Sequence, residues 1–161
     1  GKKGYEDVNE EFITMLKKSE DLRSKLTDAI KDDVDVFNQV MSAYGMPKET
    51  DEQKQKRTES IQLALKDATD VPLACAKLCR EVIDLCESAA EKGNANVVSD
   101  AGVALLAGYA GLRSAALNVY INIGGIKDEA FANDRRQQLE SLLDGIEIHK
   151  EDVYELVKSK L

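Results

Sequence analysis

Residues 101–123 form a run that is almost wholly apolar and carries one charge, Arg113. The run is long enough to cross a bilayer. It is rich in Gly and Ala rather than Leu and Phe, however, and a charge in mid-span costs several kcal/mol in hydrocarbon. We therefore expect a buried central helix within a bundle of helices, and no membrane span.

A polar row interrupts this run, because Ser114, Asn118 and Asn122 follow one another at intervals of four residues. On a helix they share one face, each about one turn beyond the last. Burial of an unpaired amide costs ~1–3 kcal/mol, so a packed helix needs partners for such a row. Other side chains, ordered water or a ligand could supply them.

The rest of the chain also favours helix. It has two prolines and no tryptophan in 161 residues, and apolar side chains recur at intervals of three and four. No strand pattern competes. We predict an all-α, antiparallel up-and-down bundle of long helices, formed as one domain over residues 1–161.

Four helices are expected, and each has boundary signals. Thr50 and Gln53 have the spacing of a capping box before the second helix, and Pro72 should kink or break that helix. Ser99 or Asp100 is expected to cap the third helix, and Asp128 to cap one last helix. The glycines of the third helix require the close approach of another backbone or a ligand. The expected ranges are 5–44, 51–90, 100–123 and 128–156.

Charge and cysteine content restrict the possible partners. The net charge is −8 and no basic block stands out, so nucleic acid is not an expected partner. Cys75, Cys79 and Cys86 fall near one helical stripe, but the single histidine, His149, is distant in sequence. We expect reduced thiols that pack as small apolar groups in a cytoplasmic protein, and no bound metal.

Several polar residues have both a functional and a structural interpretation. Asp33 lies on an apolar stripe, where burial would raise its pKa towards the range of a general acid, unless the stripe drifts to a wet edge. Arg57 and Lys54 could hold an anion, or simply form a solvated first turn. Ser99 and Asp100 could act as a helix cap alone.

A set of short segments takes the interpretation further. In chain order they are Gly1-Lys2-Lys3 with Tyr5, Asp33 with Phe37, Met46-Pro47-Lys48, Arg57, Val71-Pro72-Leu73, Gly93-Asn94, Ser99-Asp100, Gly102-Val103-Ala104, and Asn118-Val119 with Ile121-Asn122. In this order and spacing the set resembles the folate cyclodeaminase/cyclohydrolase family. That family includes the C-terminal domain of formiminotransferase-cyclodeaminase and stand-alone methenyltetrahydrofolate cyclohydrolases.

The resemblance implies an all-helical homodimer that acts on a tetrahydrofolate carrying a one-carbon unit, without a metal or an organic cofactor. One branch closes 5-formiminotetrahydrofolate to 5,10-methenyltetrahydrofolate with loss of ammonia. The other branch hydrolyses the methenyl compound to 10-formyltetrahydrofolate. We expect the cyclodeaminase first, the cyclohydrolase as the alternative, and a non-catalytic interaction module as a third possibility.

The resemblance also suggests roles for individual residues. Asp33 and Asp100 are the candidates for general acid-base catalysis. The expected substrate-binding residues are Ser99 together with three groups. Asn94, Asn118 and Asn122 could bond to the pterin or fix a water, Phe37 could stack on the ring, and Lys3, Lys48 or Arg57 could bind the glutamate carboxylates. Family members usually carry a Pro-Gly-Gly-Gly-Ser-type segment and a helix before the Gly-Lys-Lys stretch. This sequence begins at that stretch, so we expect one helix fewer here.

Overall fold

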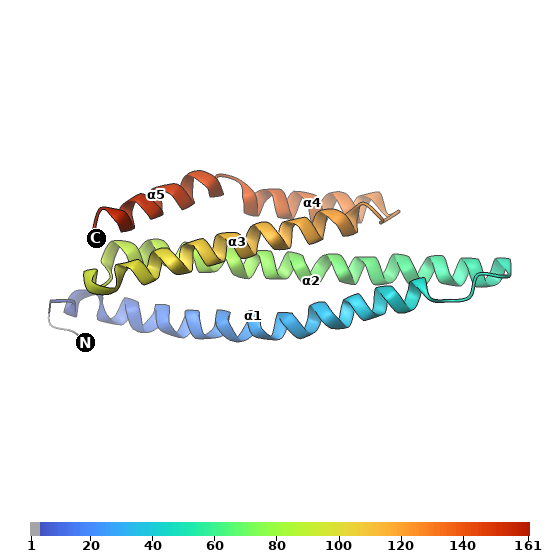
Figure 1. The fold of residues 1–161 in the computed structure, drawn as a ribbon, viewed down its shortest axis with the longest axis horizontal. Coiled ribbons are helices and arrows are strands. Elements are labelled where there is room, and N and C mark those ends of the chain that lie inside the picture. The colour runs from blue at the N-terminus through green and yellow to red at the C-terminus, as the bar shows by residue number, and fades with distance from the viewer. Residues whose placement is uncertain (1–3) are drawn as a thin grey trace.

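The computed structural model describes residues 4–161 and contains no strand over that range. Its elements are η1 (Glu6–Val8), α1 (Asn9–Tyr44), α2 (Asp51–Lys92), η2 (Ala95–Val97), α3 (Val98–Ile123), α4 (Glu129–Leu143) and α5 (Ile146–Lys158). Helix α2 runs antiparallel to α1 and to α3, which point in the same direction, and α4 and α5 return one after the other along α3 (Figure 1). The predicted all-α antiparallel bundle is confirmed.

Local capping sets several of the helix ends. The backbone N–H of Gln53 donates to the Thr50 hydroxyl over 3.2 Å, and the Gln53 side chain accepts from the Thr50 N–H, which is the predicted capping box. Asp128 caps α4 by accepting from the Phe131 N–H over 3.1 Å. Both predicted caps are confirmed.

The predicted start of the third helix is wrong. Helix α3 begins at Val98 with no side-chain cap, so Ser99 and Asp100 lie inside its first turn. The chain enters α3 directly from η2, where the Asn94 side chain accepts from the Asn96 N–H over 3.1 Å. Side-chain capping therefore occurs before η2, several residues earlier than expected.

The last segment is two helices rather than one. Helix α4 ends at Leu143, and Gly145 has a φ of +65°, the left-handed conformation that glycine adopts without a Cβ penalty. The apolar stripe continues across this break, because Leu139 and Ile146 are both fully buried. The pattern of apolar residues therefore gave no sign of the break between α4 and α5.

Helix α2 continues through Pro72 without the expected break. Proline has no N–H, so the carbonyl of Ala68, four residues earlier, loses its helical donor. The side-chain amide of Asn122 on α3 donates to that carbonyl over 2.6 Å. A group on a neighbouring helix thus replaces the missing bond.

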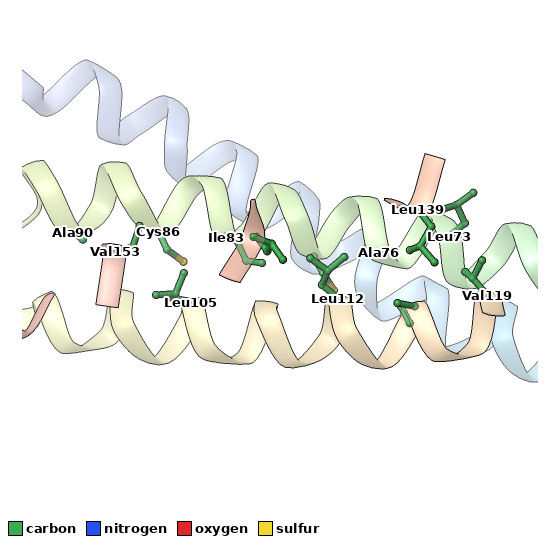
Figure 2. Packing of buried hydrophobic residues seen from close by; sticks show 14 of the residues in the cluster. Leu73, Ala76, Ile83, Cys86, Ala90, Leu105, Leu112, Val119, Leu139 and Val153 are labelled. Carbon is green, nitrogen blue, oxygen red and sulfur yellow. The ribbon is translucent and has the colours of Figure 1, made fainter. Parts of the chain in front are cut away.

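The main core lies between α2 and α3, with α4 and α5 closing it from one side (Figure 2). Ile83, Leu105 and Leu112 are fully buried there. A Cβ built on Gly111 would lie 2.8 Å from the Cys79 sulfur, and one on Gly108 would lie 3.2 Å from Ile83. The glycines of α3 are therefore needed for close approach, as predicted.

Helix α1 belongs to the core only in part. Its buried residues are Leu22, Val36 and Ala43, whereas Phe37 and Tyr44 are exposed. It packs against α2 rather than α3. The surface between α1 and α3 is consequently hollowed, with α2 as its floor.

Candidate functional site

A groove of about 390 Å³ lies between the middles of α1, α2 and α3. Its polar side chains are Asp33 from α1 and Ser114 and Asn118 from α3. Pro72 and Cys75 of α2 form part of its floor. The groove thus brings a carboxylate of α1 next to a hydroxyl and an amide of α3 that are distant from it in sequence.

Asp33 is solvent-exposed, and it also lines the groove. Of the two interpretations that the sequence left open for Asp33, the structure supports the one with a solvated edge of the stripe. A positioned carboxylate can accept a proton from a bound water or substrate and return it. The arrangement is therefore suited to general acid-base chemistry on a ligand that can also bond to Ser114 and Asn118.

The members of the polar row of α3 have different surroundings: two face the groove and one bonds to the backbone of α2. Ser114 and Asn118 are exposed and line the groove. Asn122 is half-buried, and its amide donates to the Ala68 carbonyl. The partner of Asn122 is therefore the backbone of α2, and its N–H group is already engaged in the structure.

Phe37 lies one helical turn beyond Asp33 on α1 and is 61% exposed. It is not among the residues that line the groove. An exposed aromatic ring near a groove offers a stacking surface to a flat ligand.

A second predicted group lies at the η2 end of the bundle. Asn94 lines a small hollow of about 180 Å³, while Ser99 and Asp100 are exposed in the first turn of α3. At 1.5 Å per residue, Asp100 lies roughly 21 Å along α3 from Ser114. The structure does not bring this group to the groove that contains Asp33.

The predicted cationic residues lie elsewhere again. Arg57 donates from Nε and Nη2 to the Tyr44 carbonyl over 3.2 and 3.1 Å, so it caps the end of α1. Lys48 is exposed in the loop between α1 and α2, and Lys3 lies outside the described residues. None of the groove-lining residues is Lys or Arg.

A larger apolar trough, of about 680 Å³, runs on from the groove towards the start of α1. Leu26 and Ile30 line both hollows. The polar side chains of the trough are Ser19, Arg23 and Thr27, all from α1. The groove is therefore the polar end of a longer, mostly apolar depression.

Comparison with known proteins relates this chain to a family. A sequence model described as formiminotransferase-cyclodeaminase matches residues 1–141. The chain belongs to the formiminotransferase-cyclodeaminase family.

Relatives of this family match along most of the chain. The chain is 59% identical to a methenyltetrahydrofolate cyclohydrolase of Methylorubrum extorquens over 161 residues, which is all of this chain and 77% of that protein. It is 31% identical to the formimidoyltransferase-cyclodeaminase of Sus scrofa over 143 residues, which is 89% of this chain and 26% of that longer protein. Both relatives are named as enzymes.

A solved structure in the family has the same fold. The formiminotetrahydrofolate cyclodeaminase of Thermotoga maritima superposes with a TM-score of 0.81 at 34% identity, covering 99% of this chain and 74% of that one. The helical bundle of the formiminotransferase-cyclodeaminase family is therefore retained here.

Cys75 is a groove residue that the sequence analysis treated only as core. It is half-buried, and its hydrogen bond with Cys79 lowers the pKa of the Cys75 thiol to about 7, against the opposing effects of its own burial and of Asp33. Burial raises the pKa of Cys86 to about 11. The i, i+4 spacing of Cys75 and Cys79 was the available signal that these two thiols touch.

Among residues 4–161 there is no group of His, Cys, Asp and Glu side chains that could hold a metal ion. The cysteines are free thiols, as expected.

Proposed function

We propose that this protein is a folate one-carbon enzyme that hydrolyses 5,10-methenyltetrahydrofolate to 10-formyltetrahydrofolate in the cytoplasm, with no metal or organic cofactor. The observation that carries the proposal is the 59% identity to a methenyltetrahydrofolate cyclohydrolase along the entire chain. The groove with Asp33, Ser114 and Asn118 supports it as the place for acid-base work.

The proposed reaction needs a base and then an acid at one position. A water oxygen adds to the carbon between N5 and N10 of the folate and gives up a proton. The bond from that carbon to N5 then breaks as N5 takes up a proton, so that a formyl group stays on N10. Of the two protons of the water, one ends on N5 and the other is released to solvent.

Asp33 is the proposed group that accepts the first proton and returns it to N5. Positioned acid-base catalysis of this kind contributes ~10²–10⁴ in rate. In the proposal, Ser114 and Asn118 hold the water or the pterin by hydrogen bonds, and Phe37 stacks on the ring. Because no Lys or Arg lines the groove, the glutamate carboxylates extend beyond it.

Cyclodeamination of 5-formiminotetrahydrofolate is the second candidate. It is favoured by the superposition with the Thermotoga maritima cyclodeaminase at 34% identity. In this reaction N10 attacks the formimino carbon and loses its proton. The formimino nitrogen takes up that proton through the catalytic carboxylate and a second proton from solvent, and its bond to the carbon then breaks, so that it leaves as ammonia. The same groove would serve, because both reactions pass through a tetrahedral carbon between N5 and N10.

An optical assay of the purified protein against both folates tests the proposal. Methenyl absorbance is followed while ammonia is measured in the same sample. Loss of methenyl absorbance faster than the uncatalysed rate, without ammonia, supports the cyclohydrolase. Methenyl formation with equal ammonia supports the cyclodeaminase instead. If neither rate exceeds the uncatalysed control, the interaction module is the remaining interpretation.

A further inference from the structure

Cys75 lies in the groove, and the proposed reaction does not use it. The same residue also lines a second hollow, of about 620 Å³, that is formed by α1 and α2 alone. Ala29 of α1 and Val71 of α2 line both hollows as well. The half-buried Cys75 thiol therefore lies where the two hollows meet, and it is open to small molecules from each.

Cys79, one helical turn further along α2, is the hydrogen-bond partner of Cys75. It is 5% exposed, and a Cβ built on Gly111 would lie 2.8 Å from its sulfur, so α3 covers it. The hydrogen bond with Cys75 and burial raise the pKa of Cys79 above its usual range. Cys79 therefore keeps its proton and donates it to the bond, and Cys75 is the thiol that ionises and reacts.

The two thiols cannot join in a disulfide while α2 stays helical. Residues four apart on a helix have Cβ atoms about 5–6 Å apart, whereas a disulfide needs a separation of about 3.5–4.5 Å. Cys79 therefore does not displace a group that is bound to Cys75 through sulfur. Removal of such a group needs a thiol from outside the protein.

Negative charge predominates around the Cys75 thiol. The charged residues that line the two hollows are five acids and two lysines: Asp28, Asp32, Asp33, Asp70, Glu81, Lys25 and Lys77. Asp70 is paired with Arg135, and Glu81 with Lys18. Within residues 4–161 the other three acids form no ion pair. A cationic reagent is therefore attracted to this thiol, and an anionic one is repelled.

We propose that Cys75 is a modification site, which takes up a small aminothiol group from a cationic disulfide by reversible exchange. The Cys75 thiolate attacks one sulfur of the disulfide. A bond forms between Sγ and that sulfur as the S–S bond breaks, and the other sulfur leaves as a thiolate, which takes a proton from solvent. Cys75 is oxidised to the disulfide level and the released half is reduced to a thiol. An excess of free thiol reverses the exchange.

A group bound to Cys75 takes up part of the groove. The groove has a volume of about 390 Å³, and Cys75 shares it with Asp33, Ser114 and Asn118. The ammonium of the aminothiol also offsets the negative charge of Asp33, the proposed acid-base group. Modification should therefore stop turnover, and this consequence rests on the proposed function. The exchange at Cys75 does not depend on it.

Three small disulfides of similar length test the site: cystamine, 2-hydroxyethyl disulfide and 3,3′-dithiodipropionate, which end in ammonium, hydroxyl and carboxylate groups. Intact mass and peptide mapping should find one group per chain, at Cys75. Each rate is divided by the rate of the same disulfide with 2-mercaptoethanol, which corrects for the leaving thiol. The corrected rate with cystamine should exceed that with dithiodipropionate by about tenfold or more, and added salt should narrow the difference.

Matched variants locate the thiol and the charge. Cys75→Ser should take up no group, whereas Cys86→Ser, which removes a buried thiol outside both hollows, should react as the unaltered chain does. Asp32→Asn should lower the cystamine rate by about twofold or more. Asp35→Asn should leave it unchanged, because exposed Asp35 lines neither hollow. Helical circular dichroism checks that each variant folds.

Turnover is measured before and after cystamine, with each variant compared with its own untreated rate. The unaltered chain should lose turnover and regain it with excess dithiothreitol, and Cys75→Ser should keep its own rate. Full turnover in a chain modified at Cys75 would overturn the effect on the groove.

Two other results would overturn the site itself: uptake at Cys79 or Cys86 in place of Cys75, and corrected rates that are equal for the cationic and anionic disulfides. A chain that takes up the group at Cys75 but has no turnover before treatment supports the site and contradicts the proposed function. The two failures are therefore distinguishable.

Discussion

The side-chain amide of Asn122 donates a 2.6 Å hydrogen bond to the backbone carbonyl of Ala68. That carbonyl is the one Pro72 leaves without a helical donor. The bond connects α3 to α2 one helical turn before Pro72, and it explains why a proline in the middle of α2 causes no break.

Asn122→Ala should lower the free energy of unfolding by ~1–3 kcal/mol, because it leaves a partly buried carbonyl without a donor. In a Pro72→Ala background the residue at position 72 regains its N–H, so the same substitution should cost less. Denaturant unfolding of the four members of this cycle measures the coupling. Equal costs in both backgrounds would show that Asn122 does not replace the proline's missing bond.

Gly111→Ala should destabilise the protein by ~1–3 kcal/mol through overpacking. The added Cβ would lie 2.8 Å from the buried Cys79 sulfur. Gly124→Ala is the control, since a Cβ there would meet nothing nearer than 3.5 Å and its φ is −63°. In thermal unfolding, Gly111→Ala should have a lower midpoint temperature than Gly124→Ala. Adding Cys79→Ala to Gly111→Ala should restore part of the lost stability. No recovery would place the strain elsewhere.

Cys75 should be the first thiol to react with iodoacetamide. Thiolate is the reactive form, so the rate should rise with pH and reach half its maximum near the pKa of about 7. Cys86, with a pKa raised to about 11 and little exposure, should react far more slowly. Peptide mapping by mass spectrometry between about pH 5 and 9 gives both rates.

Removal of the Cys79 thiol gives a second check on Cys75. The Cys79→Ala variant loses the hydrogen bond that lowers the pKa of Cys75, so the midpoint for Cys75 should move to higher pH. A midpoint that stays near 7 would assign the lowered pKa to another cause.

Asp33→Asn should reduce kcat by ~10²–10⁴ with little change in KM, because the amide cannot accept and return a proton. Asp35→Asn is the control, since it removes the same charge from an exposed position two residues along α1, outside the groove. Steady-state kinetics with the favoured folate compares the two. If kcat fell equally in both variants, the effect would come from the general loss of negative charge and would not be specific to Asp33.

The sequence predicted the features that depend on neighbouring residues. Thr50, Gln53 and Asp128 cap helices through bonds that span three residues, so their types and spacing were sufficient. The glycines of α3 indicated close packing because a residue without a side chain allows its neighbours to approach the helix closely. The break at Gly145 was missed because the apolar stripe from Leu139 to Ile146 continues across it.

The sequence did not predict which residues of different helices contact one another. Asn122 and Ala68 are 54 residues apart, so the polar row gave no sign of which member would meet the backbone of α2. The exposure of Phe37 depends on α1 packing against α2 alone. The separation of Asp100 from Ser114 could have been predicted, because the rise of a helix sets it at roughly 21 Å.

The shallow burial of α1 bears on how the protein responds to heat. Only Leu22, Val36 and Ala43 of its residues are buried, whereas α2 and α3 share the main core. Such an element can detach as its own cooperative unit at lower free energy than the rest. Asp33 and Asn118 thus lie on parts of unequal stability, so warming should abolish turnover while most of the helical signal persists.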